Sequence, residues 1–254
     1  MPSDATLFRR RQLEWKVSVL KAAERLRDAL ESTRLDVPFV YDPLQYAWGP
    51  HAAYVTQYGD ISKAGRVLLI GMNPGPNGMG QTGVPFGDVE YVRDWMGITG
   101  AVTQPKHQHP KRPITGFATT RREPSGSRLY GWASARFGTA ASFFDRFFVA
   151  NYCPLLFFDD EGKNLTPPQL PVATRRAVDE ACEAHLSDVV EAIEPSLVVG
   201  IGAYAEQKAR HVMAERGHTM GVGGILHPSP ASPLANKGWA QQAEKQLRAL
   251  GVVL

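Results

Sequence analysis

A short stretch of the chain combines two amide side chains and an aromatic ring. Asn73, Gln81 and Phe86 lie in segment 71–87, which follows the apolar run 67–70 and contains six glycines and three prolines. An amide can donate and accept hydrogen bonds along the edge of a nucleobase, and an aromatic face can stack on one. The segment therefore indicates a base pocket built on a rigid loop at the end of a strand.

Two simpler interpretations of segment 71–87 remain open. Glycine and proline also mark ordinary tight connections between a strand and a helix. The glycines could instead hold a phosphate, although the segment contains neither G-x-x-x-x-G-K-S/T nor G-x-G-x-x-G, the two fingerprints of nucleotide binding.

The surrounding elements are expected to alternate between strands and helices. Apolar runs predict buried strands at 67–70, 143–153, 197–201 and 222–226. Helical spacing predicts helices at 8–34, from Asp88 as the N-cap to residue 98, and at 173–194, 203–216 and 233–250. Residues 36–59, 100–131 and 159–176 are expected to be irregular, the first with one helical turn. Such alternation implies a parallel sheet with helices on both faces.

This topology places the residues that could do chemistry at one edge of the sheet. The carboxyl ends of parallel strands lie side by side, and open α/β sheets bind their ligands there. Loops that follow three of the expected strands begin near Asn73, Asn151 and His227, and Phe86 lies at the end of the first loop. We therefore expect these four side chains to converge.

The composition limits the class of protein. With 254 residues, 43% of them hydrophobic, one large domain is expected. No apolar run approaches the ~20 residues of a membrane-spanning helix, and the N-terminus has no apolar signal-peptide core. The net charge of +3 permits nucleic-acid binding without indicating it. These features predict an intracellular protein, cytoplasmic in a bacterium or nuclear in a eukaryote, and not secreted.

Neither a metal nor an organic cofactor is expected. Cys153 and Cys182 are too few for a four-thiolate site and form no disulfide framework. His107 and His109 lie one residue apart, with no carboxylate or third ligand near them in the sequence, which is a weak metal signal.

Three motifs resemble those of the uracil-DNA glycosylase superfamily, and most closely its single-strand-selective monofunctional branch. They are GMNPGPNGMGQTGVPFG at 71–87, NYCPLLFF at 151–158 and HPSPASPLANKGW at 227–239. Further agreement lies at 41–59, 92–100, 109–113 and 162–167, so the resemblance covers about residues 40–254. It implies a single domain over 1–254, with an N-terminal helix within 1–35 packed on it. The implied fold is a three-layer α/β/α sandwich with a central four-stranded parallel sheet.

The resemblance assigns the reaction to a few side chains. It implies that Asn73 positions the attacking water and that His227 donates a hydrogen bond toward uracil O2 as negative charge grows there. Asn151 would pair with the uracil edge, donating to O4 and accepting from N3–H, a pattern that cytosine reverses. Phe86 would stack on the flipped base.

The other pocket residues implied by the resemblance concern the 5-position of the base. The Met72 backbone and Met79 would line the pocket. Gly75 matches the place where uracil-only relatives carry a bulky side chain against C5. With glycine there, a 5-substituent is expected to have room, so 5-hydroxymethyluracil is expected as a second substrate.

Two segments match DNA-contacting parts of the family. The first includes Lys163, Asn164, Thr166, Arg175 and Arg176, and the second includes Ser229, Pro230, Ala231, Ala235, Asn236, Lys237 and Gly238. The chain departs from the family at Ala231 and Ser232, where members can carry a basic residue that fills the gap left by the flipped base. Because flipping a base out of a duplex costs a few kcal/mol, this departure predicts weaker action on duplex DNA.

The motifs together predict a base-excision repair glycosylase that acts as a monomer on single- and double-stranded DNA, hydrolyses the N-glycosidic bond of uracil and leaves an abasic site. Three alternatives remain. A glycosylase–lyase would need a lysine nucleophile, and Lys237 is the only lysine in the three motifs. A damage-binding protein without turnover would keep the pocket. A small-molecule nucleotide-binding protein would use segment 71–87 for phosphate.

Overall fold

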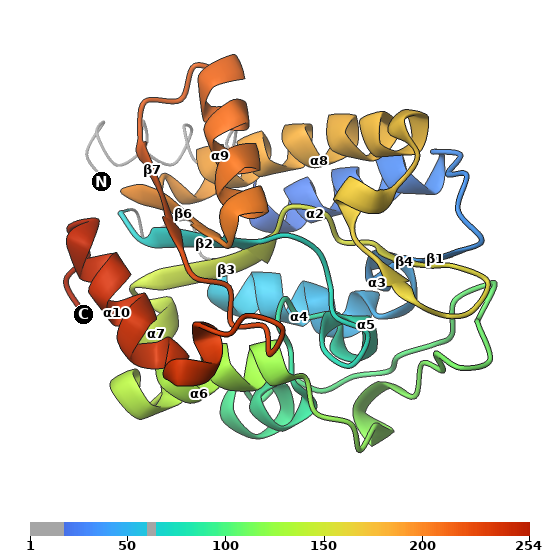
Figure 1. Ribbon diagram of the computed structural model, residues 1–254, viewed down its shortest axis with the longest axis horizontal. Helices are drawn as coiled ribbons and strands as arrows, with labels where there is room; N and C mark the ends of the chain where they lie inside the picture. Colours follow the sequence, from blue (N-terminus) through green and yellow to red (C-terminus); the bar gives the residue numbers. More distant parts are fainter. Residues whose placement is uncertain (1–17, 60–64) are drawn as a thin grey trace, which may run out of the picture.

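A four-stranded parallel sheet forms the centre of the molecule (Figure 1). The computed structural model describes residues 18–59 and 65–254. The strands are β2 (Val67–Gly71), β3 (Phe147–Asn151), β6 (Leu197–Ile201) and β7 (Gly221–Ile225), and they lie in the order β3–β2–β6–β7. β2 and β3 are buried along their whole length, which explains their uninterrupted apolar sequences. The predicted parallel sheet of four strands is confirmed.

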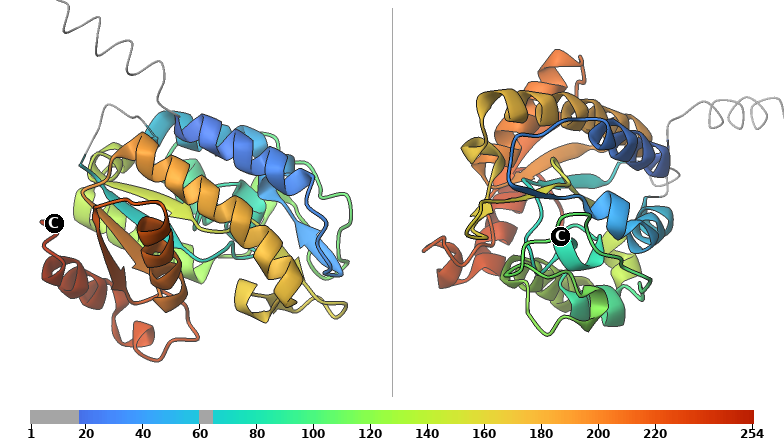
Figure 2. Two further views of the ribbon diagram at one scale, coloured as in Figure 1. Left: turned by 90° about the horizontal axis from the view of Figure 1, so that it is seen from above. Right: turned by 90° about the vertical axis from the view of Figure 1, so that its right-hand side faces the viewer.

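Helices cover both faces of this sheet (Figure 1, Figure 2). One face carries α2 (Val19–Glu31), α8 (Val172–Ile193) and α9 (Ala203–Glu215). The other carries α4 (Trp48–Tyr58), α6 (Pro124–Phe137), α7 (Ala140–Phe144) and α10 (Trp239–Ala249). The molecule is therefore the three-layer α/β/α sandwich that the motifs imply.

Shorter elements complete the fold. A small antiparallel sheet contains β1 (Phe39–Tyr41), β4 (Leu156–Phe158) and β5 (Asn164–Leu165). The short helical turns are α3 (Pro43–Tyr46), α5 (Met79–Thr82), the π-helical η1 (Tyr91–Trp95) and the 3-10 turns η2 (Gly116–Ala118), η3 (Pro167–Gln169) and η4 (Ala235–Lys237). Within the described ranges, no helix has the length and apolar character needed to cross a membrane.

Helix α2 buries the apolar face that its amphipathic spacing predicts, and it packs mainly along α8 rather than on the sheet, where it was expected (Figure 2). Ser18 caps α2, because its side chain accepts a hydrogen bond from the Lys21 N–H at 3.2 Å. The part of the predicted helix 8–34 that precedes residue 18 lies outside the described residues.

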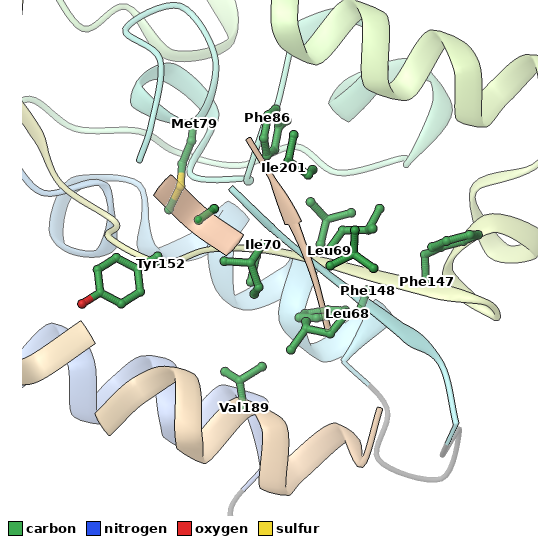
Figure 3. Packing of buried hydrophobic residues seen from close by; sticks show 14 of the residues in the cluster. Leu68, Leu69, Ile70, Met79, Phe86, Phe147, Phe148, Tyr152, Val189 and Ile201 are labelled. Carbon is green, nitrogen blue, oxygen red and sulfur yellow. The ribbon is translucent and has the colours of Figure 1, made fainter. Parts of the chain in front are cut away.

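The hydrophobic core extends from the sheet to the carboxyl ends of its strands (Figure 3). The aliphatic side chains of β2 and the phenylalanines of β3 are buried together. Met79 and Phe86, from the loop after β2, belong to the same cluster. This loop is therefore anchored in the close-packed interior, which limits its movement.

Residues 36–59 are largely helical, which corrects the prediction of an irregular loop. Asp42 caps α3 by accepting a hydrogen bond from the Leu44 N–H at 2.9 Å, and Pro43 takes the first helical position. α4 follows and buries a histidine, two tyrosines and a valine at helical spacing. Pro43 and Pro50 lie in first helical turns, where a missing N–H costs nothing, and Pro38 directly precedes β1.

Three other predicted boundaries were wrong. Helix α6 begins inside segment 100–131, and the strand expected over 143–153 is divided between α7 and β3. Thr139 caps α7 by accepting a hydrogen bond from the Ser142 N–H at 3.1 Å. The helix expected over 233–250 is divided at Gly238, whose φ is +102°. The apolar run at 143–153 has no period of its own, so tertiary burial decides how it is divided.

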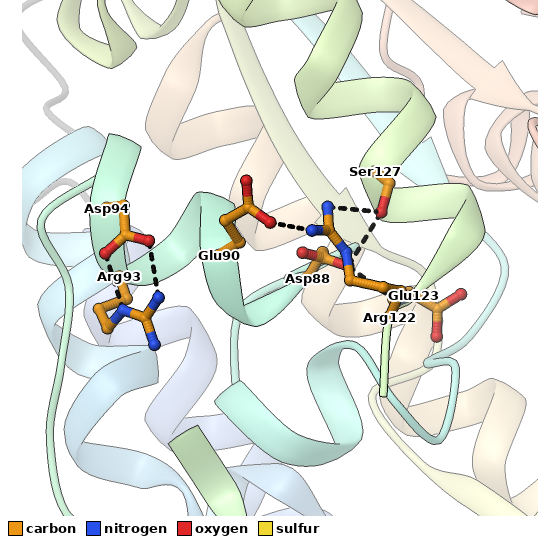
Figure 4. A network of polar contacts seen from close by, with 7 residues as sticks. All are labelled: Asp88, Glu90, Arg93, Asp94, Arg122, Glu123 and Ser127. Atoms are coloured by element: carbon orange, nitrogen blue, oxygen red, sulfur yellow. Dashed lines mark hydrogen bonds and ion pairs between the residues drawn. The ribbon is translucent and has the colours of Figure 1, made fainter. Parts of the chain in front are cut away.

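Asp88 occupies the predicted N-cap position, directly before helical residues 89–95, and its carbonyl accepts from the Val92 N–H at 3.0 Å, but its side chain is used elsewhere. Its carboxylate accepts hydrogen bonds from Arg122 Nε at 3.0 Å, from the Glu123 N–H at 2.8 Å and from Ser127 Oγ at 2.9 Å (Figure 4). Because these donors lie at the start of α6, Asp88 ties the end of the 71–87 loop to that helix.

Candidate active site

The carboxyl ends of the strands bring three loops together. Gly71 at the end of β2 pairs with Asn151 at the end of β3, and β7 ends two residues before His227. The ring centroids of Phe86 and His227 are 6.1 Å apart. Side chains from distant parts of the chain thus meet at one edge of the sheet, where open α/β sheets bind ligands.

Gly71 allows the amide and the aromatic ring to approach each other. A Cβ at this position would lie 2.6 Å from Phe86 Cε2, and Asn151 Oδ1 would be closer still. Real Cβ atoms essentially never come within 3.0 Å of another heavy atom. The absence of a side chain at Gly71 is therefore what lets Phe86 and Asn151 approach each other at the end of β2.

The Asn151 side chain has hydrogen-bonding capacity to spare. It is 8% exposed, and its Nδ2 lies 3.3 Å from the Met79 sulfur, which is a weak acceptor. Its Oδ1 is buried and has no hydrogen-bond partner among the described residues. Leaving such an oxygen unpaired costs about 1–3 kcal/mol. This cost indicates that a ligand with an N–H donor completes the site.

His227 is held as a neutral donor. Its Nδ1 accepts a hydrogen bond from the Ser229 N–H at 3.0 Å, so the proton of the neutral ring lies on Nε2. Burial lowers the pKa of His227 below its ordinary value. Gly202, with φ of +93°, lies behind the ring, where a Cβ would come 3.2 Å from the His227 Cβ.

Phe86 adopts a backbone conformation that is rare for an aromatic residue. Its φ is +56°, in the left-handed region that favours glycine. Helix α6 supports this conformation from behind. The Tyr130 hydroxyl donates to Pro85 O at 2.7 Å, and a Cβ on Gly126 would lie 2.9 Å from the Phe86 carbonyl carbon. Strain of this kind concentrates at binding sites and is stabilised by the structure around it.

Asn73 is oriented by the loop that follows β3. Its Nδ2 donates to Leu155 O at 3.3 Å, which leaves Oδ1 as the acceptor end of the amide. The carbonyl of the preceding Met72 accepts from the Cys153 N–H at 3.0 Å. These two bonds join the start of the 71–87 loop to the end of β3.

Glu123 packs against the 71–87 loop, a contact that the sequence did not reveal. The space beside Gly75 holds its carboxylate, because a Cβ on Gly75 would lie 2.7 Å from Glu123 Cδ, and one on Gly78 would lie 2.7 Å from its Cγ. Burial raises the pKa of Glu123, the backbone N–H groups of Ser125 and Asn77 lower it, and the charge of Asp88 raises it. Glu123 is far from segment 71–87 in the sequence, so no local pattern links the two.

Gln81 is a structural residue, which corrects its assignment to the base pocket. It is 4% exposed, and its Nε2 donates to Pro76 O at 3.0 Å and to Pro113 O at 3.1 Å. Its Oε1 accepts from the Thr115 N–H at 2.9 Å and the Gly116 N–H at 3.1 Å. Both ends of the amide are thus occupied in joining two loops, and none of its capacity remains for a ligand.

The first expected DNA-contacting segment forms the turn from β5 into α8. Lys163 and Arg176 are exposed, and Arg175 is half-buried. Thr166 begins η3 and forms a capping box with Gln169. Asn164 Oδ1 is buried and has no hydrogen-bond partner in the described part of the chain.

The second segment is pinned to α6. Arg128 donates to Pro228 O at 3.0 Å and to Asn236 Oδ1 at 2.7 Å, and Asn236 Nδ2 donates to Pro230 O at 2.8 Å. Ser229, which also holds His227, is half-buried, whereas Pro230, Ala231, Asn236 and Lys237 are exposed, Gly238 is half-buried and Ala235 is buried. Ala235 can therefore meet DNA only through its backbone.

His109, one of the two neighbouring histidines, is bonded to backbone groups. His109 Nδ1 accepts from the Lys111 N–H at 3.1 Å and its Nε2 lies 3.0 Å from Asp160 O, so the ring is used in packing. Within the described ranges, no group of three or more His, Cys, Asp or Glu side chains could hold a metal ion. Cys153 and Cys182 are buried free thiols.

The chain is similar to proteins of known family. A family model described as "Uracil DNA glycosylase superfamily" matches residues 57–249. The single-strand selective monofunctional uracil-DNA glycosylase of Rattus norvegicus is 46% identical over 234 residues, covering 91% of this chain and 84% of that protein. Its counterpart from Bos taurus is 46% identical over 231 residues, covering 90% of this chain and 84% of that protein.

The fold is shared with a solved structure. The crystal structure of wild-type SMUG2 from Pedobacter heparinus matches with a TM-score of 0.64 and 19% identity, covering 91% of this chain and 97% of that chain. At this identity the likeness concerns the fold alone. The family match and the high identity to curated relatives go further: this chain belongs to the uracil-DNA glycosylase superfamily, in its single-strand-selective monofunctional branch.

Proposed function

We propose that this protein removes uracil from DNA by hydrolysing the N-glycosidic bond and leaves an abasic site. One observation carries the proposal. The Asn151 amide has an unpartnered oxygen, and the amide and the Phe86 ring both lie against Gly71. Uracil presents an N3–H donor next to the O4 acceptor, so Oδ1 would accept from N3–H and Nδ2 would exchange the weak Met79 sulfur for O4. Cytosine reverses this pattern and would leave buried groups unpaired.

His227 supplies the donor for the leaving base. Breaking the bond develops positive charge on the sugar and negative charge on uracil, as in other glycosyl hydrolysis. Because Ser229 fixes the tautomer, the Nε2–H can donate toward O2 as the charge grows. One preorganised donor of this kind is worth about 2.7–4 kcal/mol.

Asn73 positions the attacking water. An amide is not a base at neutral pH, so its contribution is orientation. The hydrogen bond to Leu155 O fixes the plane of the amide and presents Oδ1 to a water proton. The developing charge on the sugar makes a strong base unnecessary.

The space beside Gly75 determines the response to a 5-substituent. The resemblance places Gly75 against C5 of the base, and in this chain the Glu123 carboxylate occupies the adjoining space. A 5-hydroxymethyl group would therefore meet an acceptor for its hydroxyl proton rather than an apolar wall. On this basis the proposal includes 5-hydroxymethyluracil as a substrate, with Glu123 as its contact.

The uracil base is part of a DNA strand, so DNA is the partner. The enzyme acts as a monomer, because segments of one chain form the whole pocket. The two segments around Arg176 and Lys237 would hold the phosphates on either side of the pocket. Lys237 lies on the exposed η4 turn, which suits a phosphate contact better than a buried Schiff-base nucleophile.

Base release from end-labelled oligonucleotides tests the function. Each would hold one uracil, single-stranded or opposite guanine or adenine, and products would be resolved with and without alkali. We expect strand breaks only after alkali, lost in Asn73→Ala and kept in Gln104→Ala, an exposed amide outside the pocket. Breaks without alkali would establish a lyase and direct attention to Lys237. Binding without release would leave a damage-binding protein.

A further inference from the structure

The loop that carries His227 also carries an exposed leucine. Across residues 18–59 and 65–254, three large hydrophobic side chains are highly exposed: Val172 at 55%, Leu234 at 57% and Val253 at 75%. Single exposed hydrophobic residues are common and indicate nothing by themselves. Leu234 differs because its neighbours and its backbone are also unusual.

The loop that carries Leu234 has an apolar tip and contains no acidic residue. Pro230, Ala231 and Pro233 are exposed in the same loop, so the leucine extends an apolar tip. Segment 216–243 contains no Asp or Glu, and Lys237 follows the tip. Such an apolar tip, with a cation beside it, suits insertion into DNA, which has stacked apolar bases inside and charged phosphates outside.

The backbone under Leu234 is held at several points. Its carbonyl accepts from the Lys237 N–H at 3.1 Å and from Gln242 Nε2 of α10 at 2.6 Å. The next residue, Ala235, is buried in the core. Arg128 of α6 holds the loop from the other side, where β7 leads toward α10 (Figure 1). The side chain is therefore presented to solvent on a rigid support, which lowers the entropy lost on insertion.

We propose that Leu234 is the side chain that enters the base stack where the uracil nucleotide has left it. This inference rests on the proposed function. Flipping a nucleotide leaves a gap, and proteins that unstack bases commonly insert leucine or proline into it. Ala231 ends at Cβ and cannot fill the gap, whereas Leu234 has three more carbons. The chain thus carries an apolar wedge despite lacking the family's basic one, and duplex DNA is within its range.

Leu234→Ala tests the wedge by comparing two substrates. On duplex DNA we expect the single-turnover rate of uracil release to fall about tenfold, because the gap left by the flipped nucleotide is then unfilled. On single-stranded DNA, which has no stack to open, the rate should stay within about twofold. Leu234→Met, which keeps the length and apolar character, should restore most of the duplex rate. Val253→Ala, an exposed valine near the chain end, serves as the matched control.

A fluorescence measurement tests whether Leu234 unstacks the bases, and it does not require the enzyme to turn over. 2-Aminopurine beside the uracil brightens when it is unstacked, and the duplex would carry a 2′-fluorinated uracil nucleotide that resists cleavage. The wild type should raise the signal and Leu234→Ala should not, at protein concentrations that saturate both.

Equal duplex rates and equal fluorescence for wild type and Leu234→Ala would overturn the wedge. A duplex defect in Val172→Ala but not in Leu234→Ala would also overturn it and place the wedge on the other loop. Failure of the wild type to release uracil from either substrate would refute the proposed function, and the fluorescence would still decide the role of Leu234.

Discussion

The proton on His227 is fixed by its neighbour rather than by the ring itself. The Ser229 N–H points at Nδ1, so a second proton would have to enter Nδ1 against another donor. Burial also disfavours the charged ring and lowers its pKa. Both effects keep His227 neutral at and above its ordinary pKa of about 6.5.

The pH dependence of base release follows from this neutral state. On single-stranded uracil DNA, we expect the single-turnover rate to be level above pH ~6.5 and to fall only below it, as the ring gains its proton. His227→Gln should be slower by about 10²-fold, the usual effect of losing one preorganised donor, and should lose the acidic decline. A rate that rises on acidification would contradict a neutral donor.

Glu123 gives a prediction that concerns one substrate only. Hydrogen bonds to charged groups are worth about 1.5–3 kcal/mol, so Glu123→Gln should lower release of 5-hydroxymethyluracil about tenfold. Release of uracil, which has no 5-substituent, should change less than about twofold. Competition between the two bases in one oligonucleotide measures the ratio directly.

Glu90→Gln is the matched control for this ratio, because Glu90 is a nearby exposed carboxylate that pairs with Arg122 (Figure 4). An equal loss for both bases in Glu123→Gln would assign Glu123 to loop structure instead of substrate recognition.

At the scale of elements, the site depends on how α6 and the end of β2 support the loop between them. Gly126 and Tyr130 of α6 hold the backbone around Phe86, and Arg128 of the same helix holds the loop after His227. One helix therefore aligns the stacking wall with the donor loop. This role cannot be seen in the α6 sequence, since its three residues act on separate partners.

Gly71→Ala should disturb both pocket walls at once. The added Cβ would collide with Phe86 and Asn151, and overpacking of this kind costs about 1–3 kcal/mol. We expect a lower free energy of unfolding in urea and a loss of uracil release. Gly49→Ala is the control, because a Cβ there meets only Ala101 O at 3.9 Å within α4, and the change should stabilise the protein by about 0.4–1 kcal/mol. A stable and active Gly71→Ala variant would show that the close approach is unnecessary.

At the scale of the whole molecule, a buried histidine makes stability depend on pH. His51 belongs to α4 and faces the 71–87 loop, where its Nδ1 lies 2.8 Å from Gly83 O. Burial lowers its pKa to about 4, and the hydrogen bond to Gly83 opposes this. The unfolded chain, with a histidine pKa of about 6.5, therefore binds the proton first. Its contribution to stability is complete above pH ~6.5 and is lost as the pH falls toward 4.

Urea titrations between pH 7 and 4 measure this effect. The free energy of unfolding of the wild type should fall more steeply on acidification than that of His51→Gln, by up to about 1.4 kcal/mol per pH unit. The comparison removes the contributions of all other titrating groups common to both proteins. Parallel curves would show that His51 is not the source.

The sequence was sufficient for the parts of the fold that depend on local pattern. Buried apolar runs predicted β2 and β6, and helical spacing predicted α8 to within about one residue. It failed for α4 and α6, whose prolines and glycines weaken the local signal while burial of their aromatic faces stabilises the helices. A segment with strong hydrophobic periodicity forms the expected element in most contexts, whereas the structure of a segment with weak periodicity depends on what it packs against.

For the site, the sequence by itself determined which residue types stand at the strand ends. Asn73, Asn151 and His227 follow apolar runs, and a parallel sheet must gather such positions at one edge. Only the tertiary structure decided that Gln81 is structural, that Glu123 lies beside Gly75, that Ser229 fixes the His227 tautomer and that Leu234 stands exposed. The physical reason is the range of the interactions. The positions of the strands follow from local apolar runs along the chain, but hydrogen bonds and close contacts join atoms whose separation in sequence carries no signal.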